Sequence, residues 1–139
     1  MTAGSSMTPR DLAEVLLKKA EDDFTTLKVV AADERVVDRN VGLHAEQAIE
    51  KGLRAVLTAA GIRAKGTRHN IDLLIELLRE RFDIPDWLDE ASALSPFAGV
   101  IRYMDVPVDE PVNREATGFL VERTLEWCRE RVDELGEQE

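Results

Sequence analysis

Cysteine is nearly absent from this sequence. Cys128 is the single cysteine among 139 residues, so no disulfide can form within the chain, and one cysteine with two histidines cannot complete a closed structural zinc site. No apolar run approaches the roughly 20 residues needed to span a bilayer, and the first residues lack the apolar segment of a signal peptide. We therefore expect a soluble, cytoplasmic protein with no membrane partner. No glycine-rich phosphate loop occurs, and neither a cofactor nor a metal is expected.

Aromatic residues and positive charge are also scarce. Aromatic residues make up 5% of the chain, so the core must consist mainly of aliphatic side chains and alanine. The 18 Lys and Arg residues are outnumbered by 28 Asp and Glu residues, which gives a net charge of -10. Non-specific affinity for nucleic acid comes from neutralised phosphates, which an acidic chain does not provide. Any nucleotide or RNA would therefore need a local basic cluster.

The hydrophobic periodicity is helical, and no alternating strand pattern occurs. It predicts helices over about 9–32, 38–60, 70–82 and 112–135. A further segment beginning at Pro85 is interrupted by Pro96, where either a helix kinks or Ser95 and Pro96 start a new one. We predict an all-α fold: an antiparallel four-helix up-and-down bundle with an additional short or kinked helix.

Several helix ends carry sequence signals. Thr8 and Pro9 suit an N-cap and a first helical position, and Gly61 suits the left-handed residue that follows a helix. Asn113 is expected to cap the last helix, and Gly136 to end it. The predicted organisation is a disordered lead of residues 1–7, one domain over 8–136 and an acidic tail of residues 137–139.

The stretch 40–57 has two helical faces. One is apolar, and on the other His44, Gln47, Lys51 and Arg54 recur at steps of three and four. This polar face is either an exposed helix surface, with Glu50 and Arg54 paired four residues apart, or the floor of a binding site. The carboxylates of Glu46 and Glu50 are interpreted as a solvated helix face rather than a metal site.

Two other groups of polar residues stand out. Arg63, Lys65, Arg68 and His69 precede the third predicted helix, where cations beside a helix N-terminus suit an anion site. The alternative for this group is a solvated loop. The other group is the pair at 102–103, Arg-Tyr, at the end of an apolar segment, where the tyrosine can equally be part of the core.

Three segments, AEQAIEKGLRAVL, RHNIDLLIELL and IRYMD, together resemble the HEPN domain family over about residues 8–135. Residues 47–51 match the family's Q-A-x-E-K pattern. Residues 69–71 are similar to its His-Asp-Leu, with Asn in place of Asp. Residues 102–104 are similar to its Arg-Tyr-Pro, with Met in place of Pro.

The resemblance implies a helical bundle, usually a homodimer, with a polar cleft for a nucleotide or single-stranded RNA. Such proteins are often encoded beside a minimal nucleotidyltransferase, which makes that class of protein the expected partner. The binding residues implied by the resemblance are Gln47, Glu50, Lys51, His69, Arg102 and Tyr103.

Many HEPN proteins are metal-independent ribonucleases that use an Arg and a nearby His, the Arg in the region of Arg102 here. No histidine follows Arg102 in this chain, so the resemblance leaves the catalytic residues unknown, with His69 and His44 as candidates. The leading hypothesis is a nucleotide/RNA-binding component of a toxin–antitoxin-type pair with a nucleotidyltransferase. The alternatives are a ribonuclease toxin with a histidine as acid/base group, and a non-catalytic helical module that docks a partner protein.

Overall fold

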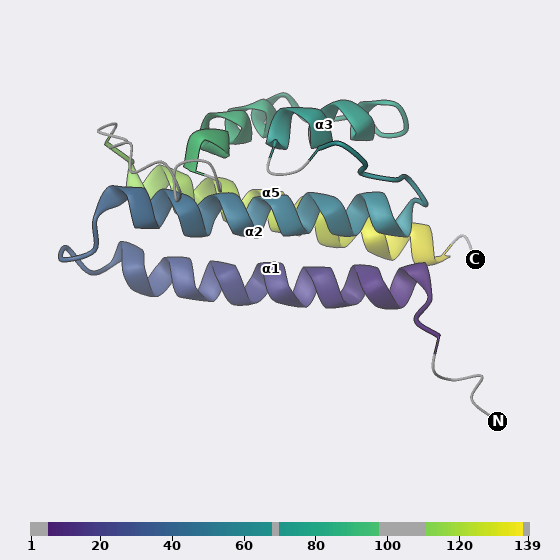
Figure 1. Ribbon diagram of the computed structural model, residues 1–139, viewed down its shortest axis with the longest axis horizontal. Helices are drawn as coiled ribbons and strands as arrows, with labels where there is room; N and C mark the ends of the chain where they lie inside the picture. Colours follow the sequence, from purple (N-terminus) through teal and green to yellow (C-terminus); the bar gives the residue numbers. More distant parts are fainter. Residues whose placement is uncertain (1–5, 68–69, 98–110, 138–139) are drawn as a thin grey trace.

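The computed structural model describes residues 6–67, 70–97 and 111–137, and over these residues the chain is all-α. Its elements are α1 (Pro9–Ala31), α2 (Asp38–Ala59), α3 (Ile71–Arg79), the 3₁₀ helix η2 (Asp86–Phe97) and α5 (Arg114–Glu137). α1 runs antiparallel to α2, η2 leads the chain back along the other side of α2 after the short α3, and α5 runs in the direction of α2 (Figure 1). The predicted all-α bundle is confirmed, with two short helices in the third position.

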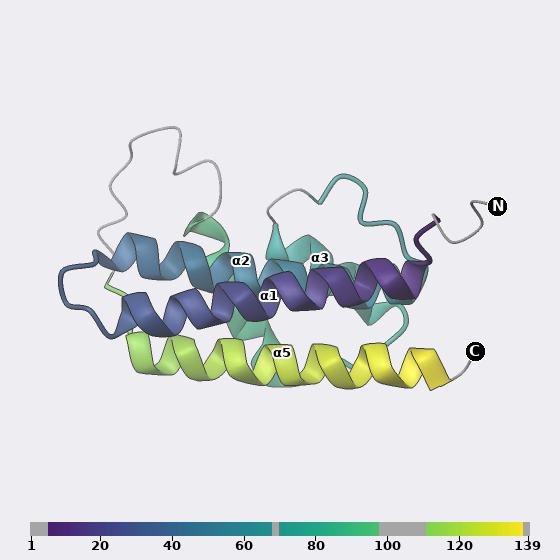
Figure 2. The ribbon, with the colours of Figure 1, turned by 90° about the horizontal axis from the view of Figure 1, so that it is seen from below.

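α2 is the central helix of the bundle. It contacts α1, α3, η2 and α5. α1 lies on one side of α2, and α3 and η2 lie on the other (Figure 1). Figure 2 shows α1, α2 and α5 running side by side along their lengths. As a result, no residue of α2 from Val41 to Ala59 is exposed. Most of these residues are buried, and those with intermediate exposure lie mainly along one strip of the helix.

The core is mainly aliphatic, as the shortage of aromatic residues predicts. Among the described residues, Phe97 and Trp127 are the aromatic side chains that are buried in it. Glycines let neighbouring elements approach α2 closely. A Cβ atom on Gly52 would lie 2.8 Å from Cδ2 of Leu125 and 3.2 Å from Sγ of Cys128. α2 and α5 therefore pack at a distance that leaves no room for a side chain at Gly52.

The predicted start signals of the first and last helices are confirmed. Thr8 and Asp11 form a reciprocal capping box at the start of α1, and Asn113 Oδ1 accepts a hydrogen bond from the Ala116 N–H at the start of α5. The expectation that Gly136 ends the last helix is wrong, because α5 continues to Glu137. The end of the Arg10 side chain lies where a Cβ on Gly136 would be.

The segment after Pro85 is a 3₁₀ helix that continues through Pro96 to Phe97. The Ser95 hydroxyl, a candidate for starting a new helix, instead accepts a hydrogen bond from the Ile71 N–H at 3.2 Å and so caps α3. Asn70 Oδ1 accepts from the Leu73 N–H at the same end. An aspartate at position 70 could cap α3 in the same way, so Asn and Asp are interchangeable for this role.

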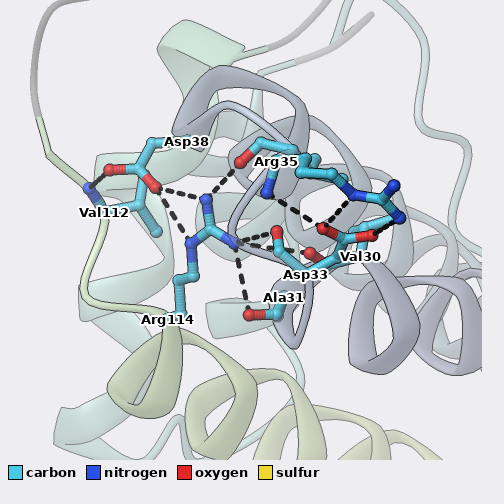
Figure 3. Close-up of polar contacts among 8 residues, drawn as sticks. Val30, Ala31, Asp33, Arg35, Asp38, Val112 and Arg114 are labelled. Atoms are coloured by element: carbon cyan, nitrogen blue, oxygen red, sulfur yellow. Dashed lines mark hydrogen bonds and ion pairs between the residues drawn. The ribbon is translucent and has the colours of Figure 1, made fainter.

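Arg114 joins three parts of the chain at the end of the bundle where α1 ends (Figure 3). Its guanidinium donates to the carbonyls of Val30, Ala31, Asp33 and Val36. It also forms an ion pair with Asp38 at 2.9 Å. The last carbonyls of a helix have no partner within it, so Arg114 acts as a C-terminal cap for α1 supplied from α5.

Asp38 completes this cluster at the start of α2. Its Oδ2 accepts a hydrogen bond from the Val112 N–H at 3.1 Å, while its Oδ1 accepts from Nε of Arg114 at 3.0 Å (Figure 3). The Val112 N–H, followed by the Arg114 guanidinium, holds the pKa of the Asp38 carboxyl below its usual value. The carboxylate therefore ties α2 to the segment that enters α5.

Three sequence expectations lie wholly or partly outside the described residues. The lead of residues 1–7 is described only from Ser6, and the tail of residues 137–139 only at Glu137. The third expectation, the Arg-Tyr pair at 102–103, lies in the segment 98–110, which is also outside them. Across the ranges that are described, no helix is both long enough and apolar enough to cross a bilayer.

Candidate functional site

The four polar residues expected on one side of α2 do lie together along its half-buried strip. His44, Gln47, Lys51 and Arg54, called the polar stripe below, all have intermediate exposure, whereas most other residues of α2 between them are buried. The rest of α2 is enclosed by its neighbours, so among the described residues the polar stripe lies on the side of the central helix that is open to solvent.

Lys51 is held in place from α1. Its Nζ lies 2.6 Å from Oδ2 of Asp23, and the two side chains are 33% and 19% exposed. The pair fixes the position of the ammonium group, which still has two further N–H donors. No sequence pattern distinguishes Asp23, because this residue lies on a charged helix face among similar carboxylates. Its pairing depends on the register between α1 and α2.

Glu50 and Arg54 form the i,i+4 pair anticipated from their spacing, with Oε1 and Nε 3.1 Å apart. Arg54 Nη2 also donates to the hydroxyl of Thr67 at 3.2 Å, and that hydroxyl donates to the Ala64 carbonyl. Thr67 is buried, and no feature of the sequence singled it out. Arg54 therefore fastens the loop after α2 onto the polar stripe.

The interpretation of Glu46 and Glu50 as a solvated face is wrong. Glu46 is 0% and Glu50 8% exposed. The reason is the position of α2: a helix with neighbours on most of its sides has little solvated surface, so its polar residues are covered as well. Within residues 6–67, 70–97 and 111–137, no group of three His, Cys, Asp or Glu side chains could hold a metal ion.

The loop after α2 has a defined path. Gly61 has a φ of 74°, as expected for the residue after a helix. The Ile62 N–H donates to the Leu57 carbonyl at 2.9 Å, and the Gly61 N–H donates to the Thr58 carbonyl at 3.1 Å. These two bonds form a Schellman motif. They end α2 and set where the chain leaves it, ahead of the exposed cations Arg63 and Lys65.

Replacing Gly61 with alanine is expected to lower the free energy of unfolding by about 1 kcal/mol, because a Cβ atom is strained at this positive φ. Gly118, inside α5, is the matched control. A Cβ there would meet no atom within 4 Å, so Gly118→Ala should raise the free energy of unfolding by about 0.5–1 kcal/mol. Urea unfolding of the two variants measures both changes. A shift in the same direction for both would contradict the assigned backbone conformations.

Of the two candidate histidines, only His44 lies among the described residues. Nδ1 of His44 is buried and has no hydrogen-bond partner among the described residues. An acid/base histidine is commonly oriented by a hydrogen bond to its second ring nitrogen, and the described surroundings of His44 provide none at Nδ1. His69 lies outside the described residues, as do Arg68, Arg102 and Tyr103. Of the residues implied by the resemblance, the structure thus brings together Gln47, Glu50 and Lys51.

Comparison with known proteins gives one clear result. The family model described as the HEPN domain matches residues 13–132, a range that includes the polar stripe, the loop after α2 and most of α5. No curated protein and no solved structure matches significantly. HEPN membership suggests a function related to nucleotides or RNA. Because the match covers most of the chain, this protein belongs to the HEPN domain family.

Proposed function

We propose that this protein binds a nucleotide or single-stranded RNA along the polar stripe of α2. The observation that carries the proposal is the pair of half-buried cations on an otherwise enclosed helix. Lys51 and Arg54 are one turn apart, and their side chains are 33% and 25% exposed. Each is positioned by a carboxylate, Asp23 or Glu50. A phosphate group would meet donors that are already ordered, so less side-chain entropy is lost on binding.

The overall charge of the chain supports a local site rather than an extended one. With a net charge of -10, most of the surface repels a polyanion, and long-range attraction cannot supply the affinity. Binding would then depend on a few contacts made at close range. Gln47 adds an amide that can both donate and accept hydrogen bonds. His69, Arg102 and Tyr103 are the residues that the family resemblance adds to this site.

We propose binding rather than cleavage. No histidine follows Arg102 in the chain, and Nδ1 of His44 has no orienting partner in the part of the chain that the structure describes. An RNA incubated with the protein in the presence of a chelator should therefore stay intact. Metal-independent cutting that disappears in His44→Ala or His69→Ala would instead establish the ribonuclease alternative.

The proposed setting is a toxin–antitoxin-type pair in which a nucleotidyltransferase is the partner protein and this chain forms a homodimer. Both the nucleotidyltransferase partner and the homodimer are proposed from family membership. Co-expression with a nucleotidyltransferase encoded beside this protein should give a stable complex on gel filtration. Sedimentation velocity at micromolar concentration should give the mass of two chains, and a monomer would refute the dimer.

Lys51→Gln is the sharpest test of the proposed site. It removes the charge but keeps a side chain of similar size, and it should weaken binding of AMP or a short oligouridylate about tenfold, because one charge-assisted hydrogen bond is lost. Calorimetry at low salt measures the affinity. The wild-type affinity should also fall steeply as salt is added.

Lys18→Gln is the matched control. Lys18 also pairs with an aspartate, Asp22, at 2.8 Å, but both side chains are exposed on α1. Its loss should leave the affinity within about twofold, since an exposed cation away from the ligand contributes little. Equal effects of the two substitutions would show that the polar stripe has no special part in binding. No binding of AMP or oligouridylate to the wild type would refute the proposed function.

A further inference from the structure

A pocket of about 680 Å³ opens where the first turn of α1 meets the end of α2 and the loop that follows it. These two helix ends lie at the same end of the bundle (Figure 1). Arg54 lines the pocket, so the pocket forms a continuation of the polar stripe. Its volume falls within the range of about 300–1,000 Å³ that is usual for small-molecule sites.

The lining of this pocket is basic. Arg54, Arg63 and Lys65 all contribute to it, and no acidic residue does so among the described residues that line it. Arg63 and Lys65 are exposed, and in the ranges 6–67, 70–97 and 111–137 neither has an ion-pair partner. The charge of Arg54 is balanced by Glu50. In a chain with a net charge of -10, Arg63 and Lys65 beside this cavity form a local positive potential that attracts an anion.

The loop that carries Arg63 and Lys65 is held in place at both of its ends. The Schellman motif at Gly61 sets where the loop leaves α2. Arg54 holds its far end through Thr67, and a second left-handed glycine, Gly66, precedes that threonine. Arg63 and Lys65 lie between these two attachments. Their backbone positions are therefore determined before a ligand arrives, which favours binding.

The start of α1 does not itself supply the attraction. Thr8 accepts a hydrogen bond from the Asp11 N–H, and the Asp11 carboxylate accepts one from the Thr8 N–H. The helix N-terminus is thus already capped by an acidic residue. What α1 adds to the pocket is apolar surface from Met7 and Leu12, which are 60% and 42% exposed, and Ile62 adds more from the loop.

We propose that this pocket binds a nucleoside di- or triphosphate, with its phosphates at Arg63 and Lys65 and its base against Met7 and Leu12. The proposal deepens the proposed function and rests on one part of it, that the protein binds a nucleotide, because it names the class of nucleotide. The terminal phosphate of a nucleoside di- or triphosphate carries more than one negative charge once its second proton is lost, and each inner phosphate adds a further charge close by. A cluster of cations in one pocket matches such a concentrated charge. A single strand of RNA, with one charge per phosphate, would need cations spread along a groove.

The apolar side of the pocket accounts for the nucleoside part. Inorganic triphosphate would contact only the cations. A flat base would also remove the apolar surface of Met7 and Leu12 from water, which adds favourable binding free energy. The order of affinities should therefore be ATP, then inorganic triphosphate, then adenosine. Leu12→Ser should weaken ATP but leave inorganic triphosphate unchanged, which separates the two halves of the pocket.

The test is calorimetry at low salt with a chelator present, using ATP and inorganic triphosphate as probes. The double variant Arg63→Gln/Lys65→Gln should bind ATP about 10- to 100-fold more weakly than the wild type, because two charge-assisted contacts are lost. Lys18→Gln/Lys19→Gln removes the same charge from an exposed part of α1 and should change the affinity by less than about threefold. Both variants alter only exposed side chains, so circular dichroism should show them folded.

The outcomes separate this inference from the proposed function. If Lys51→Gln loses ATP binding while Arg63→Gln/Lys65→Gln keeps it, the pocket proposal is overturned and the polar-stripe proposal stands. If the pocket variant loses ATP binding while Lys51→Gln keeps the binding of all nucleotides and oligouridylate, the pocket is supported and the polar stripe is not. If the wild type binds neither ATP nor inorganic triphosphate, the pocket proposal is overturned.

Discussion

Replacing Arg114 with alanine is expected to lower the free energy of unfolding by about 3 kcal/mol. The substitution removes the donor shared by the last carbonyls of α1 and by the α1–α2 loop, and it leaves the Asp38 carboxylate without its cation. The side chain is 24% exposed, so water will satisfy some of these groups and the loss will be smaller than a sum over the bonds. Urea unfolding monitored by circular dichroism measures it.

Arg114→Lys is the informative control. A lysine keeps the positive charge but has no planar fork of donors, so it can pair with Asp38 or cap α1 but cannot reach all the groups that Arg114 contacts. It should recover less than half of the lost stability. Full recovery would mean that charge alone matters at this position. A positive charge in the first turn of a helix is itself unfavourable, which is consistent with a role for Arg114 outside α5.

Acid should weaken this cluster through Asp38. Because its pKa is lower in the folded protein than in the unfolded chain, the unfolded state takes up a proton first as the pH falls. The contribution of Asp38 to stability is therefore fully present above its unfolded pKa of about 3.9 and is lost as the pH falls through the lower folded value. The stability gap between the wild type and Asp38→Asn should accordingly be constant at neutral pH and shrink below about pH 4.

Gly52→Leu should have an effect of similar size, about 3 kcal/mol of lost stability. The new side chain would have to occupy space that Leu125 and Cys128 of α5 already fill. α5 would be forced away from α2, along the interface that holds the three long helices together. Cys128 reports this separation directly, since it is the single cysteine and is buried.

Burial raises the pKa of the Cys128 thiol, so the native protein should react slowly with a thiol reagent at neutral pH. Gly52→Leu should accelerate the labelling of Cys128 many-fold below the unfolding transition. Gly118→Leu places the same side chain where α5 faces open space and should leave the labelling rate close to that of the wild type. Slow labelling in both variants would contradict the close packing of α2 on α5.

Much of the fold could be predicted because local signals and hydrophobic periodicity agree along the chain. The side chains of Thr8 and Asn113 cap the starts of α1 and α5, and Gly61 takes the left-handed conformation after α2, as expected from the sequence. Gly136 misled the prediction because a glycine near the end of a helical pattern can also lie inside the helix, and α5 continues through it to Glu137.

Long-range pairs could not be predicted from the sequence. Asp38 and Arg114 are 76 residues apart, and nothing in the sequence around either one indicates the other. The burial of Glu46 and Glu50 was missed for a related reason. A pattern of polar residues shows which side of a helix they share, but whether that side is covered depends on how many elements surround the helix.

The candidate site was predictable in part. The positions Gln47, Glu50 and Lys51 follow from the family resemblance, and the structure places all three on α2. The carboxylate that positions Lys51 comes from α1, and the pocket at the end of the polar stripe needs α1, α2 and the loop together. Such sites depend on the register between helices, which periodicity does not determine.

The most direct test of the central claim is to map ligand contacts by NMR, titrating isotope-labelled protein with AMP and with a short oligouridylate at low salt. If the ligand binds along the polar stripe, the largest chemical-shift changes should occur at Gln47, Lys51 and Arg54 of α2 and at Asp23 of α1, with little change in the second half of α5. Changes confined to α5, or none on α2 at saturating ligand, would contradict nucleotide or RNA binding at this site.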